Sequence, residues 1–365
     1  MSASTPPSAS GELSCVVLNP SALAKARTGG VLTRLLTRTA LDLAGAMVFA
    51  PSPEFARELA ELLSRDSLAG DTDPRLSMLV HDYVTKNYSP RQDGLRQRCL
   101  LLLFQGPDAI AKIKEAVGDY ETPSIRRTYG DFVRDDSGKV IYFEPAVFCP
   151  ENSRSATRLL ALFARGAEQR QADPVAKAVP RSESEAADYQ RSVVIIKPDN
   201  FDFPCGRPGS IINIFSRTDL RITAAKVDYL RVAQMEEFYA DVRTKMVEAL
   251  GETAGARRFD SLIEFMTGRK PGQCRTPEER NAPGTVKVMI LRYEGKDAIA
   301  KMREVLGPTD PAKAPPGTIR REFGVSMMIN GAHASDSPAA AEREMRILEI
   351  EQNPLAAVIR QSICF

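Results

Sequence analysis

One histidine stands at a position suited to phosphate chemistry. The chain has only two histidines, and His333 lies in residues 330–337, where an apolar run gives way to polar residues. Ser337 followed by Pro338 is typical of a helix N-cap and first helical residue, so free backbone N–H groups should lie near the imidazole. An imidazole beside such an anion site can act as a nucleophile or a base. A lone histidine at a strand end can also simply fill space, so the interpretation depends on further phosphate-binding residues.

Residues that could bind phosphate occur in the same half of the chain. A short β-branched run at residues 194–196 ends in Lys197, which places an ammonium group at the mouth of a buried strand. The other cationic and polar candidates are Tyr239, Arg303, Thr309 and Arg320. Taken singly, each is ordinary, because a strand-end lysine is usually solvated and an arginine near a helix end usually complements the helix dipole.

These candidate residues fall in four separated sequence blocks. The blocks are Ile196-Lys197-Pro198-Asp199, Phe238-Tyr239-Ala240-Asp241, residues 303–311 continuing to 316–320, and residues 330–337. In this order and spacing, residues 192–352 resemble nucleoside diphosphate kinases. In that family a histidine attacks the γ-phosphate of a nucleoside triphosphate, becomes phosphohistidine, and passes the phosphoryl group to a nucleoside diphosphate. The resemblance implies a phosphotransferase that acts on ATP and other nucleoside tri- and diphosphates, with His333 as the nucleophile.

The resemblance also implies roles for the other catalytic side chains. Lys197 and Tyr239 would lie near the transferring phosphate. Glu344 would orient the imidazole and so fix which ring nitrogen is free to attack. Phosphoryl transfer has a loose transition state whose charge is spread over three oxygens, so nearby cations, donors and Mg²⁺ stabilise it. Asp336 matches the acidic residue near the phosphate-bound Mg²⁺, acting through water, although it could also be an ordinary acidic residue of a helix N-terminus.

Nucleotide binding is implied for a partly overlapping set of residues. They are Lys197, Arg303, Thr309, Arg320, Asn330, Leu262 and Arg258, with Asn330 on the sugar hydroxyl. Arg258 stands where the family has an aromatic residue that stacks on the base, and a guanidinium can also lie flat on a base. Leu262 matches the apolar residue on the other side of the base, whereas Phe259 could belong to the core. Residues 267–285 are longer and more polar than the family turn and could cover or crowd the base.

The N-terminal half repeats the pattern of the C-terminal half. The parallel segments are 16–20 with 194–198, 27–31 with 207–211, 106–112 with 295–301, and 124–127 with 318–321. Asn19 replaces the lysine and Lys114 replaces the arginine that matches Arg303. Residues 143–148 contain no histidine. The N-terminal half is therefore predicted to be a degenerate copy without a phosphoenzyme route, and His81 to be an ordinary helix residue.

Both halves alternate strands with amphipathic helices, which predicts an α+β fold. In the C-terminal half, strands are expected at 193–196, 220–230, 286–291 and 325–329, and helices at 210–215, 232–240, 259–266, 297–305 and 338–350. This order suits a ferredoxin-like (βαββαβ) sandwich, with helices on one face of an antiparallel sheet. The resemblance implies the same fold, so the chain would carry two such domains in tandem.

The expected division of the chain has five parts: a disordered tail at 1–11, the degenerate domain at 12–170, a linker at 171–190, the complete domain at 191–352, and a C-terminal tail at 353–365. The two domains are expected to pack as an internal pseudo-dimer, and a homo-oligomer is a further expectation. Val31, Leu32, Leu35 and Leu36 would either form that interface or fill the core of their own half.

Composition limits the function classes. With 365 residues, 43% hydrophobic and 26% charged, the chain fits a soluble globular protein of two domains. A net charge of +2 does not indicate a nucleic-acid or membrane-surface partner. The six cysteines lack metal-type or redox-type spacing and are expected to be free thiols of a reducing compartment, which predicts a cytoplasmic location. The N-terminus lacks a signal-peptide pattern, and no apolar run is long enough to span a bilayer.

Two further function classes remain open. The alternative to an active kinase is a non-catalytic tandem scaffold or regulatory nucleotide-binding protein whose histidine no longer turns over. A scaffold has no structural reason to keep the complete set of kinase-like residues, which are Lys197, Tyr239, Arg303, Thr309, Arg320, Asn330, His333 and Glu344. An RNA-binding ferredoxin-like module is a more distant alternative, since the paired aromatic sheet motif and the basic surface are missing.

Overall fold

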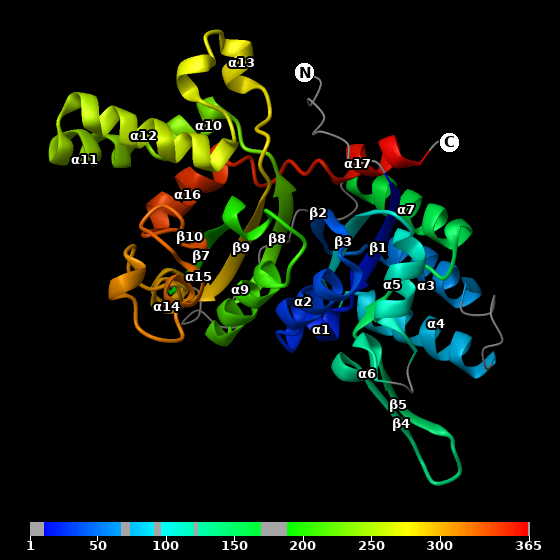
Figure 1. The fold of residues 1–365 in the computed structure, drawn as a ribbon. Coiled ribbons are helices and arrows are strands. Elements are labelled where there is room, and N and C mark those ends of the chain that lie inside the picture. Colours follow the sequence, from blue (N-terminus) through cyan, green and yellow to red (C-terminus); the bar gives the residue numbers. More distant parts are fainter. Residues whose placement is uncertain (1–10, 67–73, 91–95, 120–122, 169–187, 364–365) are drawn as a thin grey trace.

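The computed structural model describes residues 11–66, 74–90, 96–119, 123–168 and 188–363 (Figure 1). The expected N-terminal tail and linker therefore lie outside the described residues, apart from residue 11 and residues 188–190. Within the described ranges, no helix combines the length and the apolar character that crossing a membrane requires.

The C-terminal half contains a four-stranded antiparallel sheet. Its strands are β7 (Tyr189–Ile196), β8 (Arg221–Asp228), β9 (Val288–Lys296) and β10 (Ala332–Ala334). They lie in the order β10-β7-β9-β8, so the third strand in sequence separates the first from the second. This is the split βαβ arrangement of a ferredoxin-like fold, as predicted for this half.

The N-terminal half contains a sheet with the same order. Its strands are β1 (Glu12–Leu18), β2 (Asp42–Phe49), β3 (Cys99–Gly106) and β6 (Val147–Phe148), in the order β2-β3-β1-β6. Between β3 and β6 in sequence, β4 (Asp131–Arg134) and β5 (Val140–Glu144) form a separate hairpin that projects from the body (Figure 1).

Helices pack on both faces of each sheet, whereas one face was expected. The N-terminal half has α2 (Thr28–Thr39) and α5 (Ala109–Val117) on one face, and α3 (Pro53–Asp66), α4 (Pro74–Tyr88) and α7 (Ser153–Glu168) on the other. The C-terminal half has α9 (Arg207–Phe215) and α14 (Ala298–Leu306) on one face, and α10 (Val232–Phe238), α12 (Glu252–Thr267) and α16 (Pro338–Ile347) on the other. The cause lies in the strands. Val193 to Ile196 of β7 are all fully buried, and alternate side chains point to opposite faces, so both faces need an apolar cover.

The remaining helices of the described residues complete the architecture. They are α1 (Pro20–Ala24), α6 (Ile125–Tyr129), α11 (Ala240–Leu250), α13 (Pro277–Asn281), α15 (Ile319–Phe323) and α17 (Leu355–Ser362), with 3₁₀ turns η1 (Pro198–Asn200), η2 (Ser216–Thr218), η3 (Pro271–Gln273) and η4 (Pro311–Lys313). The long segment 267–285 contains η3 and α13. It is held on α10, because Arg280 on α13 donates two hydrogen bonds to the carboxylate of Glu236, at 2.6 and 2.7 Å.

Local sequence signals set the element ends near the histidine. Ser337 caps α16 as predicted, since its hydroxyl oxygen accepts a hydrogen bond from the N–H of Ala340 at 3.0 Å, with Pro338 in the first turn. The strand predicted at 325–329 was wrong. In that segment the carbonyl of Ile329 accepts from the N–H groups of Val325 and Ser326, at 2.7 and 3.0 Å, so the backbone closes on itself. The fourth strand instead begins at Ala332 and contains His333.

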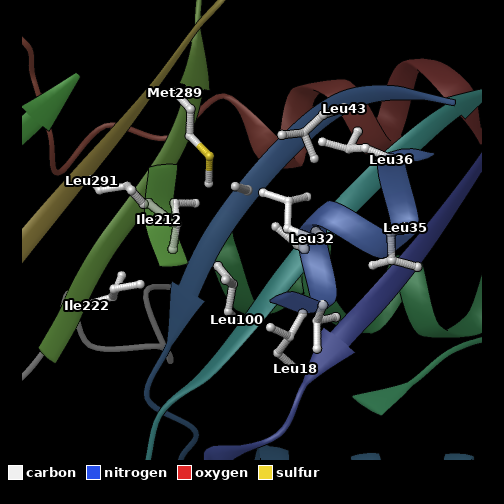
Figure 2. Close-up of a cluster of buried hydrophobic side chains, with 14 of the residues drawn as sticks. Leu18, Leu32, Leu35, Leu36, Leu43, Leu100, Ile212, Ile222, Met289 and Leu291 are labelled. Carbon is white, nitrogen blue, oxygen red and sulfur yellow. The ribbon is translucent and has the colours of Figure 1, made fainter. Parts of the chain in front are cut away.

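The sheets of the two halves contribute to a common hydrophobic cluster. Helices α2 and α9 cross so closely that a Cβ at Gly209 would lie 2.5 Å from the carbonyl oxygen of Gly29. The edge strands β2 and β8 lie side by side, and the amide of Asn353 donates to one carbonyl of each strand, at 2.9 Å. Val31, Leu32, Leu35 and Leu36, expected either at the interface or in the core of their own half, belong to a buried cluster with members from both halves (Figure 2).

Residues 353–365, which were expected to be a C-terminal tail, contain helix α17, and this helix packs on the N-terminal half. Leu355 and Ile359 of this helix are fully buried in the cluster formed with α3, α4 and α7. Arg360 forms an ion pair with Glu168 on α7. The chain therefore crosses back from the C-terminal half and completes the core of the N-terminal half (Figure 1).

Candidate active site

His333 lies on β10 and faces a carboxylate on the following helix. Its Nε2 is 3.1 Å from Oε1 of Glu344 on α16, and the second carboxylate oxygen accepts a hydrogen bond of 2.6 Å from the hydroxyl of Ser335. Among the described residues, Nδ1 of the ring has no hydrogen-bond partner. The carboxylate thus favours the tautomer with the proton on Nε2, which leaves the lone pair of Nδ1 available.

The environment of Glu344 keeps it ionised. Burial alone would raise the pKa of this carboxyl, but His333, together with hydrogen bonds from the imidazole and from Ser335, outweighs burial and lowers the pKa below its ordinary value. The Glu344 side chain is 4% exposed and that of His333 is 19% exposed, so the pair is shielded on the carboxylate side and reachable on the ring side.

Lys197 directly follows β7, the strand that pairs with β10, and its side chain is buried. Its Nζ donates to Oδ1 of Asn330 at 2.7 Å and to the carbonyl of Met328 at 3.1 Å. Burial, and then the positive charge of Arg320, lower the pKa of Lys197 to about 7. Its two hydrogen-bond acceptors are neutral, and the carboxylate of Asp199, which acts to raise the pKa, only partly offsets burial and Arg320. The site is therefore favourable for an incoming phosphate.

Arg320 on α15 provides a second cation with a similar environment. Its Nη1 donates to the carbonyl of Gly307 at 3.0 Å and to the hydroxyl of Thr309 at 3.4 Å. Burial, and then the charge of the exposed Arg303, lower the pKa of Arg320 to about 10. The amide of Asn330 donates to the carbonyl of Thr309 at 3.2 Å, while its oxygen accepts from Lys197. Asn330 thus connects Lys197 to the residue that Arg320 contacts.

Tyr239 brings a buried hydroxyl to the same site. It is 8% exposed, and its hydroxyl has no hydrogen-bond partner among the described residues. Burial, and then the charge of Glu344, raise the pKa of Tyr239 above its ordinary value, and Arg320 acts in the opposite direction. An unpartnered buried hydroxyl between a carboxylate and a guanidinium can donate to an anion that enters the site.

Two more side chains contact the His333–Glu344 pair, and the sequence patterns did not identify them. Ser335 holds Glu344, and the ring of Phe238 meets the imidazole edge-on, with 5.1 Å between ring centroids. Ser335 lies two positions after His333 and so on the same side of an extended chain, a period-two signal that could have identified it. Phe238 lies next to Tyr239, inside one of the sequence blocks.

Within the part of the chain that the structure describes, the residues expected around the nucleotide base and the metal ion form no hydrogen bond or ion pair with His333 or Glu344. Leu262 is 7% exposed and lies in the core cluster with Phe259, while Arg258 is exposed on α12. Asp336 is exposed between β10 and α16. Among the described residues, no three His, Cys, Asp or Glu side chains come together as a metal site. Arg258 and Asp336 therefore remain predictions.

The same strand register places different residues in the N-terminal half. His333 pairs with Ile195 of β7, and Phe148 pairs with Val17, which occupies the matching position of β1. Counting from the caps of α16 and α7, Leu159 stands where Glu344 does, and both Phe148 and Leu159 are buried in one apolar cluster. An apolar pair thus occupies the place of the imidazole and its carboxylate.

Three polar side chains at the matching positions of that half also have partners. Asn19, at the position of Lys197, donates to the carbonyl of Pro145 at 2.7 Å and accepts from the hydroxyl of Tyr88. Lys114 and Arg126 both face the carboxylate of Glu151, at 3.2 and 3.5 Å.

Aromatic rings fill the same region. Tyr83 packs edge-on against Phe148 and against Phe143 of β5, with 6.1 Å between centroids in each case. His81 is exposed on α4, as expected for an ordinary helix residue.

Comparisons with known proteins agree with the geometry of the C-terminal half. Residues 190–352 match the family model described as nucleoside diphosphate kinase. The nucleoside diphosphate kinase of Hydrogenovibrio crunogenus is 37% identical over 156 residues, which cover 43% of this chain and 89% of that enzyme. The corresponding enzyme of Staphylothermus marinus is 40% identical over 159 residues, covering 44% of this chain and 92% of that enzyme.

Solved structures of the same family are also similar. The Aquifex aeolicus nucleoside diphosphate kinase is 29% identical, with a TM-score of 0.33, and covers 44% of this chain and 94% of its own. The Borrelia burgdorferi enzyme, solved with vanadate and ADP as a transition-state mimic, is 27% identical, with a TM-score of 0.33, and covers 44% of this chain and 87% of its own. On the strength of the curated relatives, this chain is an enzyme that belongs to the nucleoside diphosphate kinase family.

Proposed function

We propose that the C-terminal half transfers the γ-phosphate of a nucleoside triphosphate to a nucleoside diphosphate through a phosphohistidine at Nδ1 of His333. The observation that carries the proposal is the hydrogen-bonded pair of His333 and Glu344, which leaves Nδ1 without a hydrogen-bond partner among the described residues, on a side chain that is 19% exposed. In the first step, the Nδ1 lone pair forms a bond to the γ-phosphorus, and the bond from phosphorus to the bridging oxygen breaks. The nucleoside diphosphate leaves with that electron pair. A second nucleoside diphosphate then attacks the phosphohistidine through its terminal oxygen and restores the free imidazole.

The carboxylate of Glu344 has a specific task in this scheme. The imidazole gains positive charge as Nδ1 bonds to phosphorus while Nε2 keeps its proton. A buried anion 3.1 Å from Nε2 stabilises that charge most strongly when it is fully developed. Ser335 is a positioning residue, because its hydrogen bond fixes the carboxylate rather than the substrate.

Lys197, Tyr239 and Arg320 are proposed to hold the transferring phosphate. Each is buried and keeps donors that are bonded only to neutral groups or to no described residue. A phosphate supplies the missing anionic acceptor, and in a water-poor site such charge-assisted hydrogen bonds are strong. Arg303 and Thr309 would bind the rest of the triphosphate, and Asn330 the sugar hydroxyl.

Mg²⁺ is proposed to arrive with the nucleotide. The donor set fits this mode of binding, since Asp336 is a single exposed carboxylate near the histidine, and Mg²⁺ is commonly held by one or two carboxylates together with substrate phosphates. When bound, the ion neutralises phosphate charge. Leu262 and Arg258 are proposed to lie on the two sides of the base.

The N-terminal half is proposed to be a degenerate copy with a structural role. Phe148 and Leu159 in place of the imidazole and the carboxylate leave no nucleophile there, and Glu151 neutralises its two cations. The shared core and the crossing of α2 with α9 support an internal pseudo-dimer. The alternative of a non-catalytic scaffold does not explain the open Nδ1 or the unpartnered hydroxyl of Tyr239.

Phosphate labelling tests the proposal directly. The full-length protein, incubated with γ-labelled ATP, should carry one acid-labile, base-stable label, and His333→Ala should abolish both the label and the exchange between nucleoside tri- and diphosphates. His81→Ala is the matched control and should retain both, because that imidazole is exposed and remote from the site. Full exchange by His333→Ala would refute the catalytic assignment, and label on the N-terminal half would refute the structural role of that half.

A further inference from the structure

A hollow of about 500 Å³ opens to solvent at the junction between the two halves. Its walls come from α2 and α6 on one side and from α9, η2 and α15 on the other. The polar lining residues are Thr33, Arg34, Tyr129, Ser210, Asn213, Arg217 and Glu322. None of them belongs to the proposed phosphotransfer site, and the volume lies within the range of about 300–1,000 Å³ that is usual for small-molecule sites.

The charge balance of this junction hollow is positive. It contains the guanidinium groups of Arg34 and Arg217, and neither forms a salt bridge with a residue that the structure describes. Its only carboxylate in the described lining is Glu322, whose Oε1 already accepts a hydrogen bond of 3.0 Å from the N–H of Gly317. Two unpaired cations against one engaged carboxylate favour an anionic occupant.

The side chains that line the hollow suit a small ligand rather than a bare ion. Arg34 lies over the ring of Tyr129, with 4.8 Å between Cζ and the ring centroid, so the ring supports its guanidinium. A planar guanidinium held in this way matches the oxygens of a phosphate or carboxylate group. The exposed amide of Asn213 and the hydroxyl of Ser210 add neutral groups that suit ligand hydroxyls.

We propose that the junction hollow binds a small hydroxylated oxyanion, through Arg34 and Arg217, and that this ligand modulates the kinase site. The connection runs through α15. Glu322 and Phe323 line the hollow, and Arg320 on the same short helix reaches the proposed phosphate site. A ligand that holds α15 therefore changes how firmly Arg320 is positioned. This coupling rests on the proposed role of Arg320, whereas the binding step does not.

Calorimetry on the full-length protein saturated with Mg²⁺ and ADP tests the binding step, because the nucleotide then occupies the proposed active site. Ribose 5-phosphate and citrate are the two anionic probes, which distinguish a phosphate from a carboxylate ligand, and ribose is the neutral control. The proposal requires one anionic probe to bind at least tenfold more tightly than ribose, as expected for charge-assisted contacts to two guanidinium groups. Equal or undetectable binding of all three compounds would overturn it.

Variants locate the binding. Arg34→Ala combined with Arg217→Ala should weaken the probe at least about tenfold, while Arg38→Ala, an exposed arginine one turn further along α2, should leave binding unchanged. His333→Ala should also bind the probe normally, so a failure of the proposed phosphotransfer would not be mistaken for a failure of this site. The bound probe should shift KM for ATP at least about twofold in the unmodified enzyme and not in the double variant. Probe binding that survives the double variant, or an unchanged KM, refutes the proposal.

Discussion

Replacing Glu344 by glutamine should slow phosphorylation of His333 without unfolding the protein. The substitution keeps the size of the side chain and removes its negative charge. The carboxylate is 3.1 Å from Nε2 of the imidazole and its side chain is 4% exposed, so little solvent screens the interaction. The remaining amide can still accept one hydrogen bond, but it can no longer stabilise the positive charge that develops on the ring.

The size of the effect follows from burial. Removing one partner of a fully buried ion pair costs about 3–5 kcal/mol. The imidazole side chain is 19% exposed, so solvent screens part of the interaction, and we expect a loss of about 2–4 kcal/mol of transition-state stabilisation. At about 1.4 kcal/mol for each factor of ten, the phosphorylation rate should fall roughly 30- to 1,000-fold.

Rapid-quench measurement of label transfer from γ-labelled ATP in a single turnover gives this rate directly. Glu342→Gln is the matched control, because Glu342 lies on the same helix with 66% of its side chain exposed and faces Arg191 at 3.6 Å. That variant should react at the unmodified rate, and thermal melting should show that both variants are folded. A Glu344→Gln enzyme that phosphorylates within about threefold of the unmodified enzyme would refute the reasoning.

Two more predictions concern charge and packing. Because burial and Arg320 lower the pKa of Lys197 to about 7, the free enzyme loses this charge above that pH, and kcat/KM for ATP should fall by up to about tenfold per pH unit. Lys197→Arg should flatten this limb, since a guanidinium stays charged, and a flat profile for the unmodified enzyme would contradict the prediction. Leu355→Ala and Ile359→Ala in α17 should each lower the free energy of unfolding by about 2–5 kcal/mol, because both side chains are fully buried. Arg360→Ala should cost no more than about 1 kcal/mol in the same urea titration, and equal losses for the three variants would show that α17 does not complete the core.

The sequence alone predicted the elements whose signals are local. The apolar run before Lys197 became β7, and the Ser337-Pro338 pair became the start of α16. The contact between His333 and Glu344, which the family resemblance implied, is also local, because a strand end and the helix directly after it bring residues eleven apart into contact. These signals depend on neighbouring residues, which a sequence displays directly.

Other features depended on pairing between distant segments. The strand expected at 325–329 was wrong because apolar content did not reveal that this segment closes on itself, and the partner of β7 is Ala332–Ala334. Helix α17 looked like a tail because its apolar face has no partner nearby in the sequence. That partner is α7, from the other half of the chain.

The candidate site also combines features that the sequence indicates with features that only the tertiary structure shows. The sequence, through its family resemblance, indicated which residues to propose for a phosphohistidine enzyme, and it shows that residues 143–148 contain no histidine. Only the tertiary structure decided which ring nitrogen is free, because that depends on the side of the imidazole that Glu344 meets. It also decided that Phe148 takes the position of His333, because strand register, rather than similarity of residue type, brings the two positions into correspondence.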